Sequence, residues 1–318
     1  MFMRIIHLII LVLLFCGSVC ASAQDLKIAM VLWRGETDAE AGFKEGLVEL
    51  GYNPEFQIFD CQQDVSRLGS LLHVINNDID QFDYIYTFGT TVSRRVKVVI
   101  GGRIPQIFNI VTDPVAAGIV GDMDSPGVNI SGGSDAIRIA DQLDPALRLF
   151  KVGKLGFFFN PREKNSLIIR DELYHFAREH GFTVIDFPSP PVQSSLLQNL
   201  QRLVENPDQV DIVYLSADSY LVSEAPLIGS YLRKAKVKSI SQVRSLIDHG
   251  VMMGTAGDYY ELGRAVATIV DKREKGASLR DIPVERFARF KLIMNQTTIE
   301  AIGVQIDDTV LSQAELVQ

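Results

Sequence analysis

The stretch FDYIYTFGTTVSRRVKVVIGGRIPQIFNIVTDPVAAG, residues 82–118, decides the fold of this chain. It contains two apolar runs of strand length, residues 84–88 and 106–110, and each is followed by a turn of small or polar residues. In a doubly wound sheet the carboxyl ends of parallel strands face a crevice, where helix N-termini offer free backbone N–H groups to anionic ligands. The stretch therefore predicts a small-molecule binding site that needs no catalytic residue.

The same alternation of strand and helix patterns continues on both sides of this stretch. Alternation at this spacing is typical of right-handed parallel βαβ units. Capping-box spacing at Thr37 and Glu40, and again at Asp258 and Glu261, marks two helix starts. We expect strands at residues 26–32, 55–60, 84–88, 106–110, 128–131, 154–159, 183–187, 212–215, 236–239, 251–254 and 286–294. We expect helices at residues 37–50, 64–76, 91–100, 135–149, 166–180, 194–206, 224–233 and 258–275.

This order predicts an α/β protein with two doubly wound parallel-sheet lobes. Gly and Pro cluster near Gly132, residues 254–257 and Pro283, where we place three crossings between the lobes. The N-terminal lobe would hold residues 24–132 and 254–283, and the C-terminal lobe residues 133–253 and 284–318. Three crossings make a hinge that bends while keeping the lobes in register.

The N-terminal residues 1–23 have the pattern of a secretory signal peptide: a charged start, a short apolar core and an A-x-A cleavage site. A lipidated Cys16 or Cys20 and an uncleaved anchor are the alternatives. Cleavage would leave roughly 295 residues, enough for two lobes, and would place the protein in the periplasm.

The charge balance argues against nucleic acid as a partner. Without residues 1–23, 30 basic side chains face 39 acidic ones, a net charge of −9. The three neighbouring cations Arg94, Arg95 and Lys97 indicate a solvated helix face or a docking contact. Cys61, alone after cleavage, suits a buried apolar position, and the histidines lack metal-ligand spacing, so we expect no metal and no cofactor.

Six segments in this order resemble the periplasmic substrate-binding proteins of ABC transporters, in the group that includes tryptophan- and phenylalanine-binding proteins. They are residues 83–91 (DYIYTFGTT), 105–120 (PQIFNIVTDPVAAGIV), 152–165 (VGKLGFFFNPREKN), 211–218 (DIVYLSAD), 258–267 (DYYELGRAVA) and 290–303 (FKLIMNQTTIEAIG). The resemblance implies the type I periplasmic-binding fold. It also implies a monomer that works with an inner-membrane permease and its ATPase.

Two segments depart from the family pattern at the expected cleft. Similar proteins carry a His-Pro or comparable pair soon after the first strand, where this chain has Trp33-Arg34-Gly35-Glu36. Relatives tend to read Gly-Ser-Glu-Glu before the last large helix pair, where this chain has Ser239-Ile240-Ser241-Gln242. Solute binding is therefore implied more strongly than specificity for aromatic amino acids.

Candidate ligand residues in the first lobe stand just after predicted strands. Thr90 and Thr91 either cap a helix or hydrogen-bond a ligand carboxylate or phosphate. Asp113 either opens an Asp-Pro turn or offers a carboxylate to a ligand amine or hydroxyl. Trp33 belongs either to the core or to a cleft wall, and Arg34 is either solvated or a carboxylate clamp.

Candidates in the second lobe follow the same logic. Asn165, Ser166 and Asp218 stand at strand or helix ends and serve either as caps or as ligand contacts. Ser241 and Gln242 occupy the departing segment, and Asp258 suits an N-cap better than a contact.

The sequence favours a non-enzymatic receptor that closes two lobes over a small solute and delivers it to a permease. A periplasmic sensor of the same fold, reporting to a membrane protein, is the alternative. An enzyme is disfavoured, because the chain has no G-x-S-x-G elbow, no Walker loop and no G-x-G-x-x-G after the first strand.

Overall fold

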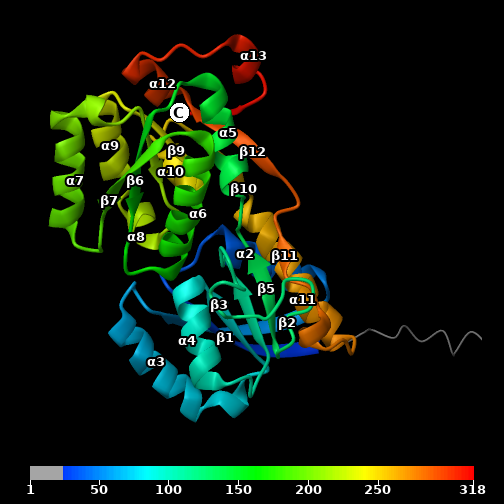
Figure 1. Ribbon diagram of the computed structural model, residues 1–318. Helices are drawn as coiled ribbons and strands as arrows, with labels where there is room; N and C mark the ends of the chain where they lie inside the picture. The colour runs from blue at the N-terminus through cyan, green and yellow to red at the C-terminus, as the bar shows by residue number, and fades with distance from the viewer. Residues whose placement is uncertain (1–23) are drawn as a thin grey trace, which may run out of the picture.

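The computed structural model describes residues 24–318, which form two α/β lobes stacked along the long axis of the molecule (Figure 1). The predicted signal peptide at residues 1–23 lies outside the described residues. Within the described part of the chain, no helix has the length and apolar character of a membrane span.

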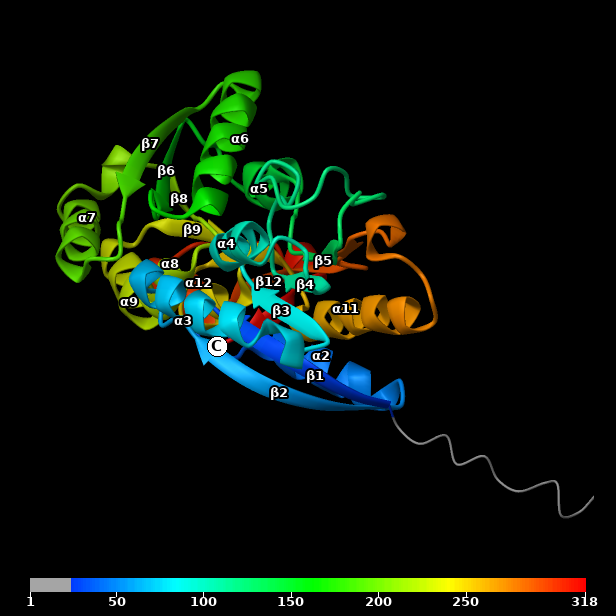
Figure 2. The same ribbon diagram turned by 90° about the horizontal axis from the view of Figure 1, so that it is seen from below.

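The N-terminal lobe is built on a six-stranded, wholly parallel sheet with the order β11-β5-β4-β3-β1-β2. Helices α2 and α11 lie side by side on one face, and α3 and α4 lie on the other (Figure 2). The strands are β1 Gln24–Leu32, β2 Tyr52–Asp60, β3 Tyr84–Phe88, β4 Gln106–Asn109, β5 Ile130–Ser134 and β11 Glu285–Arg286. The helices are α2 Asp38–Glu49, α3 Val65–Asn77, α4 Thr90–Ile100 and α11 Tyr259–Glu274.

The C-terminal lobe is built on a seven-stranded sheet with the order β13-β12-β10-β9-β8-β6-β7, in which only the β10–β12 pair is antiparallel. Its strands are β6 Lys154–Phe159, β7 Thr183–Pro188, β8 Ile212–Leu215, β9 Lys238–Ser241, β10 Met253–Gly257, β12 Phe290–Asn295 and β13 Glu315–Val317. Its helices are α5 Ile139–Leu149, α6 Lys164–His180, α7 Gln193–Glu205, α8 Ser219–Ser223, α9 Ala225–Ala235, α10 Arg244–Asp248, α12 Gln296–Ile302 and α13 Asp308–Leu311.

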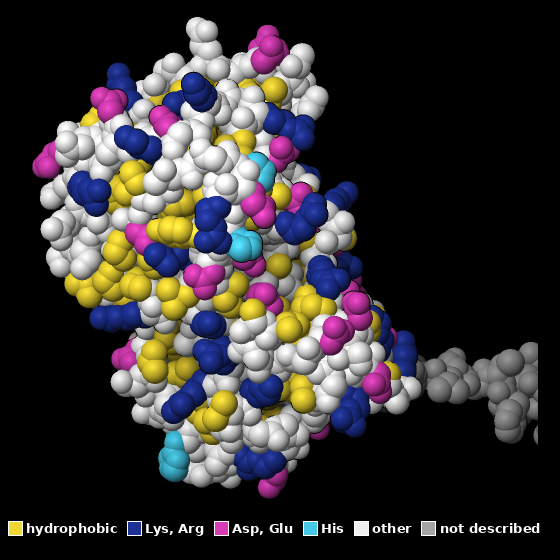
Figure 3. All heavy atoms as spheres, viewed as in Figure 1, with side chains coloured by type: hydrophobic (Ala, Val, Ile, Leu, Met, Phe, Trp, Pro, Cys, Tyr) yellow, Lys and Arg dark blue, Asp and Glu magenta, His cyan; other side chains and the backbone are white. Residues whose placement is uncertain are grey.

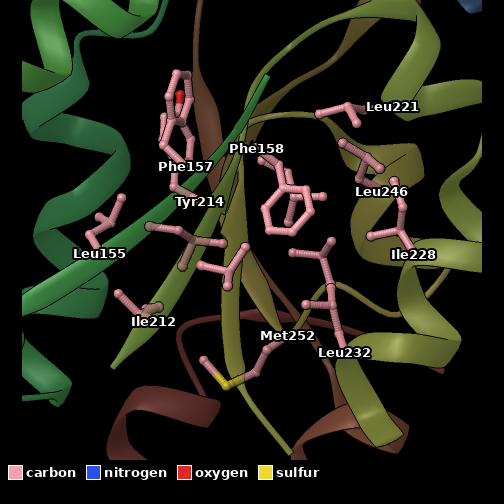
Figure 4. Close-up of a cluster of buried hydrophobic side chains, with 14 of the residues drawn as sticks. Leu155, Phe157, Phe158, Ile212, Tyr214, Leu221, Ile228, Leu232, Leu246 and Met252 are labelled. Carbon is pink, nitrogen blue, oxygen red and sulfur yellow. The ribbon is translucent and has the colours of Figure 1, made fainter. Parts of the chain in front are cut away.

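Each lobe has its own apolar core. In the C-terminal lobe, Phe157 stacks on Tyr214 at 5.4 Å and Phe158 on Phe187 at 4.6 Å between ring centroids. Figure 4 shows Phe158 of β6 facing Ile228 on α9, while Phe157 and Tyr214 lie on the opposite face of the sheet. The two separate cores let each lobe keep its shape while the hinge bends.

The chain passes between the sheets at residues 135–138, at Asp258 and at residues 287–289. All three positions differ by a few residues from those predicted. The helix expected from Asp135 begins at Ile139, and residues 254–257 complete β10 of the C-terminal sheet. The single strand predicted at residues 286–294 is wrong, because β11 pairs with β5 of one sheet and β12 with β10 of the other.

The break between β11 and β12 places Phe287 at the hinge. Its ring stacks on Tyr259 with 6.1 Å between centroids. A Cβ at Gly257 would lie 2.4 Å from the same ring, so the absence of a side chain at Gly257 makes room for Phe287. Aromatic packing therefore joins two of the crossings.

Both sheets share one strand order at their centre, β2-β1-β3-β4-β5 in one lobe and β7-β6-β8-β9-β10 in the other. In each lobe the order reverses between the first strand and the third, at β1/β3 and at β6/β8. Ligands of open α/β sheets bind beyond the carboxyl ends of the strands at this switch point. The fold thus predicts a site where the two switch points face each other.

Candidate functional site

A cavity of about 30 Å³ lies between the two lobes at these switch points. This volume is well below the roughly 300–1,000 Å³ of ordinary ligand pockets, so the lobes stand close together here. The cavity is lined by Trp33, Arg34, Phe88, Gly89, Thr90, Thr91, Ile110, Thr112, Asp135, Glu163, Asn165, Ala217, Asp218, Ser219, Val222, Val243 and Tyr259.

Trp33 and Arg34 follow β1 and form one wall of the cavity. The guanidinium of Arg34 lies 5.4 Å from the centre of the Phe88 ring. The buried Nε of Arg34 and the indole Nε1 of Trp33 have no hydrogen-bond partner, and no ion pair within residues 24–318 includes Arg34. Two donors are thus available to an acceptor brought by a ligand.

The N-terminus of α4 forms the second part of this wall. Gly89 occupies the N-cap position with φ of +83° and provides no capping side chain, and the buried Thr90 is the first helical residue. Neither Thr90 nor Thr91 therefore caps the helix, contrary to the cap alternative in the sequence analysis. An uncapped N-terminus with two hydroxyl groups beside a cavity suits an anionic ligand group.

Ile110, at the end of β4, has a φ of +53°, in the left-handed region that β-branched residues rarely adopt. Its backbone N–H donates to Oδ1 of Asn109 at 3.0 Å, while Nδ2 of the buried Asn109 has no partner. Such strain costs about 1–3 kcal/mol and clusters at binding sites. Here it places Ile110 in the cavity wall.

Three buried carboxyl groups lie around the cavity. Asp135, at the first crossing, accepts a hydrogen bond from the Tyr259 hydroxyl at 3.2 Å through Oδ2, and its Oδ1 has no partner. Glu163 accepts long bonds from Asn160 Nδ2 at 3.4 Å and from the Ser219 N–H at 3.3 Å. Asp218 caps α8 and accepts from the backbone N–H of Leu221 at 2.8 Å.

Burial raises the pKa of all three carboxyl groups. The charge of Glu163 adds to burial at Asp218, whose pKa stands well above its usual range. At Glu163 the hydrogen bond from the Ser219 N–H and the positive charge of Arg34 oppose the rise in the pKa. At Asp135 the hydrogen bond from the Tyr259 hydroxyl opposes the rise in the pKa. The cavity is thus acidic and short of cations.

These shifts predict that the folded chain loses stability as pH rises above the ordinary carboxyl range near pH 4. A carboxyl group with a raised pKa binds more protons in the folded state, so its contribution is largest in acid and is lost as pH rises through the folded pKa. We expect the free energy of unfolding of Glu163→Gln to fall less between pH 5 and pH 8 than that of the wild type. Denaturant unfolding at both pH values measures these free energies. An equal decrease in the wild type and in Glu163→Gln would contradict the prediction.

Of the residues singled out in the sequence, six line the cavity: Trp33, Arg34, Thr90, Thr91, Asn165 and Asp218. The structure does not bring five others to it. Asp113 accepts the N–H groups of Val115 and Ala116 in its turn. Ser166 bonds Ser216, and Ser241 donates to the Leu215 carbonyl at 3.1 Å. Asp258 caps α11, and Gln242 is buried beside the cavity residue Val243.

Gln242 is 4% exposed, and neither polar atom of its side-chain amide has a partner. An unsatisfied buried polar group costs about 1–3 kcal/mol. We therefore expect Gln242→Met to stabilise the chain by about 1 kcal/mol in denaturant unfolding. Gln106→Met is the matched control, because that buried amide donates to Thr87 Oγ1 at 3.2 Å and to the Ser93 carbonyl at 3.0 Å. Gln106→Met should lower the free energy of unfolding. If both substitutions changed this free energy in the same direction, the Gln242 amide would not be unpaired as described.

The ionisable cavity residues that the sequence did not single out are Asp135, Glu163 and Tyr259. Glu163 stands in the turn after β6, the position equivalent to Trp33-Arg34 after β1, and this equivalence was the available signal. Asp135 and Tyr259 lie on hinge crossings, whose positions depend on the pairing of distant strands.

Two α/β lobes joined by three crossings, with a cavity between their switch points, are the architecture of a solute-binding protein. In the space-filling view the lobes meet over a broad front, and the face shown carries both acidic and basic side chains (Figure 3).

The chain belongs to the ABC transporter substrate binding protein family, whose pattern matches residues 28–318. A tyrosine-binding protein of Clostridioides difficile (strain R20291) is 28% identical over 272 residues, covering 84% of this chain and 77% of the relative. The predicted family is confirmed.

Two solved structures share the fold at 22% identity. An ABC domain from Streptococcus pneumonia in complex with L-Trp has a TM-score of 0.81 over 92% of this chain and 100% of its own. A conserved domain protein from Vibrio cholerae has a TM-score of 0.82 over 93% and 100%. The predicted type I periplasmic-binding fold is confirmed.

Proposed function

We propose that this chain is the periplasmic receptor of an ABC importer and that its ligand is an α-amino acid with an apolar or aromatic side chain. The observation that carries the proposal is the complementary set of unpaired groups in one cavity. A carboxylate oxygen of Asp135 has no donor, while Arg34 Nε and the α4 N-terminus have no acceptor. A zwitterion supplies both missing partners.

The ammonium group of the ligand would lie between Asp135 and Glu163, and its carboxylate would receive hydrogen bonds from Arg34, Thr90 and Thr91. These residues come from both lobes and one crossing, so the ligand makes its full set of contacts only when the lobes are closed. Closure is therefore favoured by the difference in contact energy between the closed and open forms. The Trp33 and Tyr259 rings supply apolar contact area.

The family and the relatives support the rest of this proposal. The tyrosine-binding relative and the L-Trp complex both concern aromatic amino acids. The proposal includes delivery to an inner-membrane permease, export by the N-terminal segment and the absence of turnover, and membership of a transporter family supports each of these.

A binding screen tests the proposal. Thermal shift and isothermal titration of residues 24–318 against the proteinogenic amino acids and a panel of sugars should find an amino acid with micromolar or tighter affinity. Binding of sugars alone, or chemical conversion of the bound amino acid, would overturn it.

A further inference from the structure

A second cavity, of about 720 Å³, shares four lining residues with the small one. These are Arg34, Val222, Val243 and Tyr259. We call the two cavities the inner and the outer chamber. The inner chamber has room for little more than water, whereas the outer one lies within the range of ordinary ligand pockets. A ligand whose ammonium meets Asp135 therefore has space for its remaining atoms on the side of the outer chamber.

The outer chamber is bounded by both lobes and by two hinge crossings. Its further lining residues are Glu36, Thr37, Asp38, Arg244, Ser245, Asp248, Ala256, Gly257, Asp258, Tyr260, Arg289, Lys291, Ile293 and Glu315. A ligand that extends into it touches residues 257–258 and Arg289, which belong to two different crossings or their borders. Such a ligand would contact both lobes and two parts of the hinge at once.

Most charges of the outer chamber are already paired. Arg244 and Lys291 both bind Glu315, at 2.6 Å and 3.1 Å. Arg289, at the third crossing, forms no ion pair with any residue of the described chain 24–318. Arg34, the other cation of this chamber without an ion pair in the described chain, also lines the inner chamber, so the Arg289 guanidinium is the one placed for a carboxylate at the outer end of a ligand.

The acidic side chains of the chamber are mostly engaged as well. Glu36 binds Lys44 at 2.6 Å, and Asp258 accepts the N–H groups of Tyr260 and Glu261. Asp38 lies in the first turn of α2, where the helix dipole favours a carboxylate. Each of these acids has a stabilising contact of its own, and none of them forms an ion pair with Arg289.

We infer that the receptor accepts amino-acid derivatives of dipeptide size, with the amino terminus at Asp135 and the terminal carboxylate at Arg289. This inference rests on the proposed function and extends it to a ligand class. The inner chamber recognises the ammonium group, and the outer chamber holds the second residue.

Titration with L-tyrosine, L-tryptophan, the dipeptides Tyr-Gly and Trp-Gly, and the corresponding dipeptide amides tests the inference. For the wild type we expect the dipeptides to bind at least tenfold more tightly than their amides, because the amides lack the carboxylate. Arg289→Met should reduce this ratio to within threefold, with the affinity for any amino acid that binds changed by less than threefold. Arg286→Met is the matched control, since Arg286 is an exposed arginine three residues earlier that does not line the outer chamber, and it should leave the ratio unchanged.

Binding of an amino acid with dipeptides more than a hundredfold weaker would overturn the inference and leave the proposed function standing. An equal loss of preference in the Arg286 and Arg289 variants would also overturn it. If neither amino acids nor dipeptides bind, the proposed function fails and the inference fails with it.

Discussion

Gly263→Ala should destabilise the folded chain by about 3 kcal/mol, although it adds one methyl group to a helix. A Cβ at this position of α11 would lie 2.1 Å from the carbonyl oxygen of Ala39 and 2.8 Å from the backbone nitrogen of Phe43 on α2. Both atoms are backbone, so the helices must separate, and overpacking of this kind costs about 1–3 kcal/mol or more. The free energy of unfolding in denaturant measures the effect.

Glycines on both α2 and α11 make this close approach possible, so neither helix can easily move to accommodate an added side chain. A Cβ at Gly42 of α2 would lie 2.0 Å from the carbonyl oxygen of Tyr260, and one at Gly46 would lie 2.9 Å from the Cβ of Ala267. Tyr260 belongs to the first turn of α11, directly after the crossing at Asp258. Separation of the two helices would therefore also displace one of the hinge crossings.

Gly69→Ala provides the control with the same chemical change and the opposite expected sign. Gly69 lies inside α3, and a Cβ there would meet no atom within 4 Å. Alanine is favoured over glycine in a helix by about 0.5–1 kcal/mol, so this variant should be more stable than the wild type. Equal effects of the two substitutions would show that α2 and α11 are not in the described contact.

The strands at the centre of each sheet could be predicted because they are buried, and their burial is visible in the sequence as a continuous apolar run. β3, β6 and β8 are continuous apolar runs bounded by polar or glycine residues, and the structure has them at the predicted residues. A strand buried on both faces needs no partner information to be recognised. β11 is the opposite case, because two residues, Glu285 and Arg286, become a strand only by pairing with β5, some 150 residues earlier.

The residues of the site that directly follow central strands could be predicted, and those on the crossings could not. Trp33, Thr90 and Asp218 follow central strands, so the position of the strand fixes the position of the side chain. Asp113 also follows such a strand, yet its carboxylate turns back to the N–H groups of its own turn. Asp135 lies beyond the end of β5, and only the path of the chain between the lobes brings it to the cavity. That path depends on tertiary pairing, which local patterns do not contain.

Asp135→Asn should weaken binding of the amino-acid ligand by about a hundredfold. Asp135 is buried, and its Oδ1 lacks a partner in a cavity whose lining contains one cation, Arg34. Removing one partner of a buried charge pair costs about 2–5 kcal/mol, and 2.7 kcal/mol corresponds to a factor of one hundred. Isothermal titration with the amino acid that binds most tightly to the wild type measures the loss.

Asp113→Asn is the matched control, since it makes the same change 22 positions earlier at a residue that does not line the cavity. Its affinity should stay within threefold of the wild type. A ligand analogue that lacks the amino group provides a second test. If the Asp135 carboxylate acts on the ligand ammonium, this analogue should bind the wild type and the Asp135→Asn variant with similar, weak affinity. If the Asp135→Asn variant also binds this analogue more weakly than the wild type does, Asp135 does not act on the ammonium group. Its effect would then come from its hydrogen bond with Tyr259 and from the geometry of the first crossing. In that case Glu163, on the opposite side of the cleft, would have to hold the ammonium group.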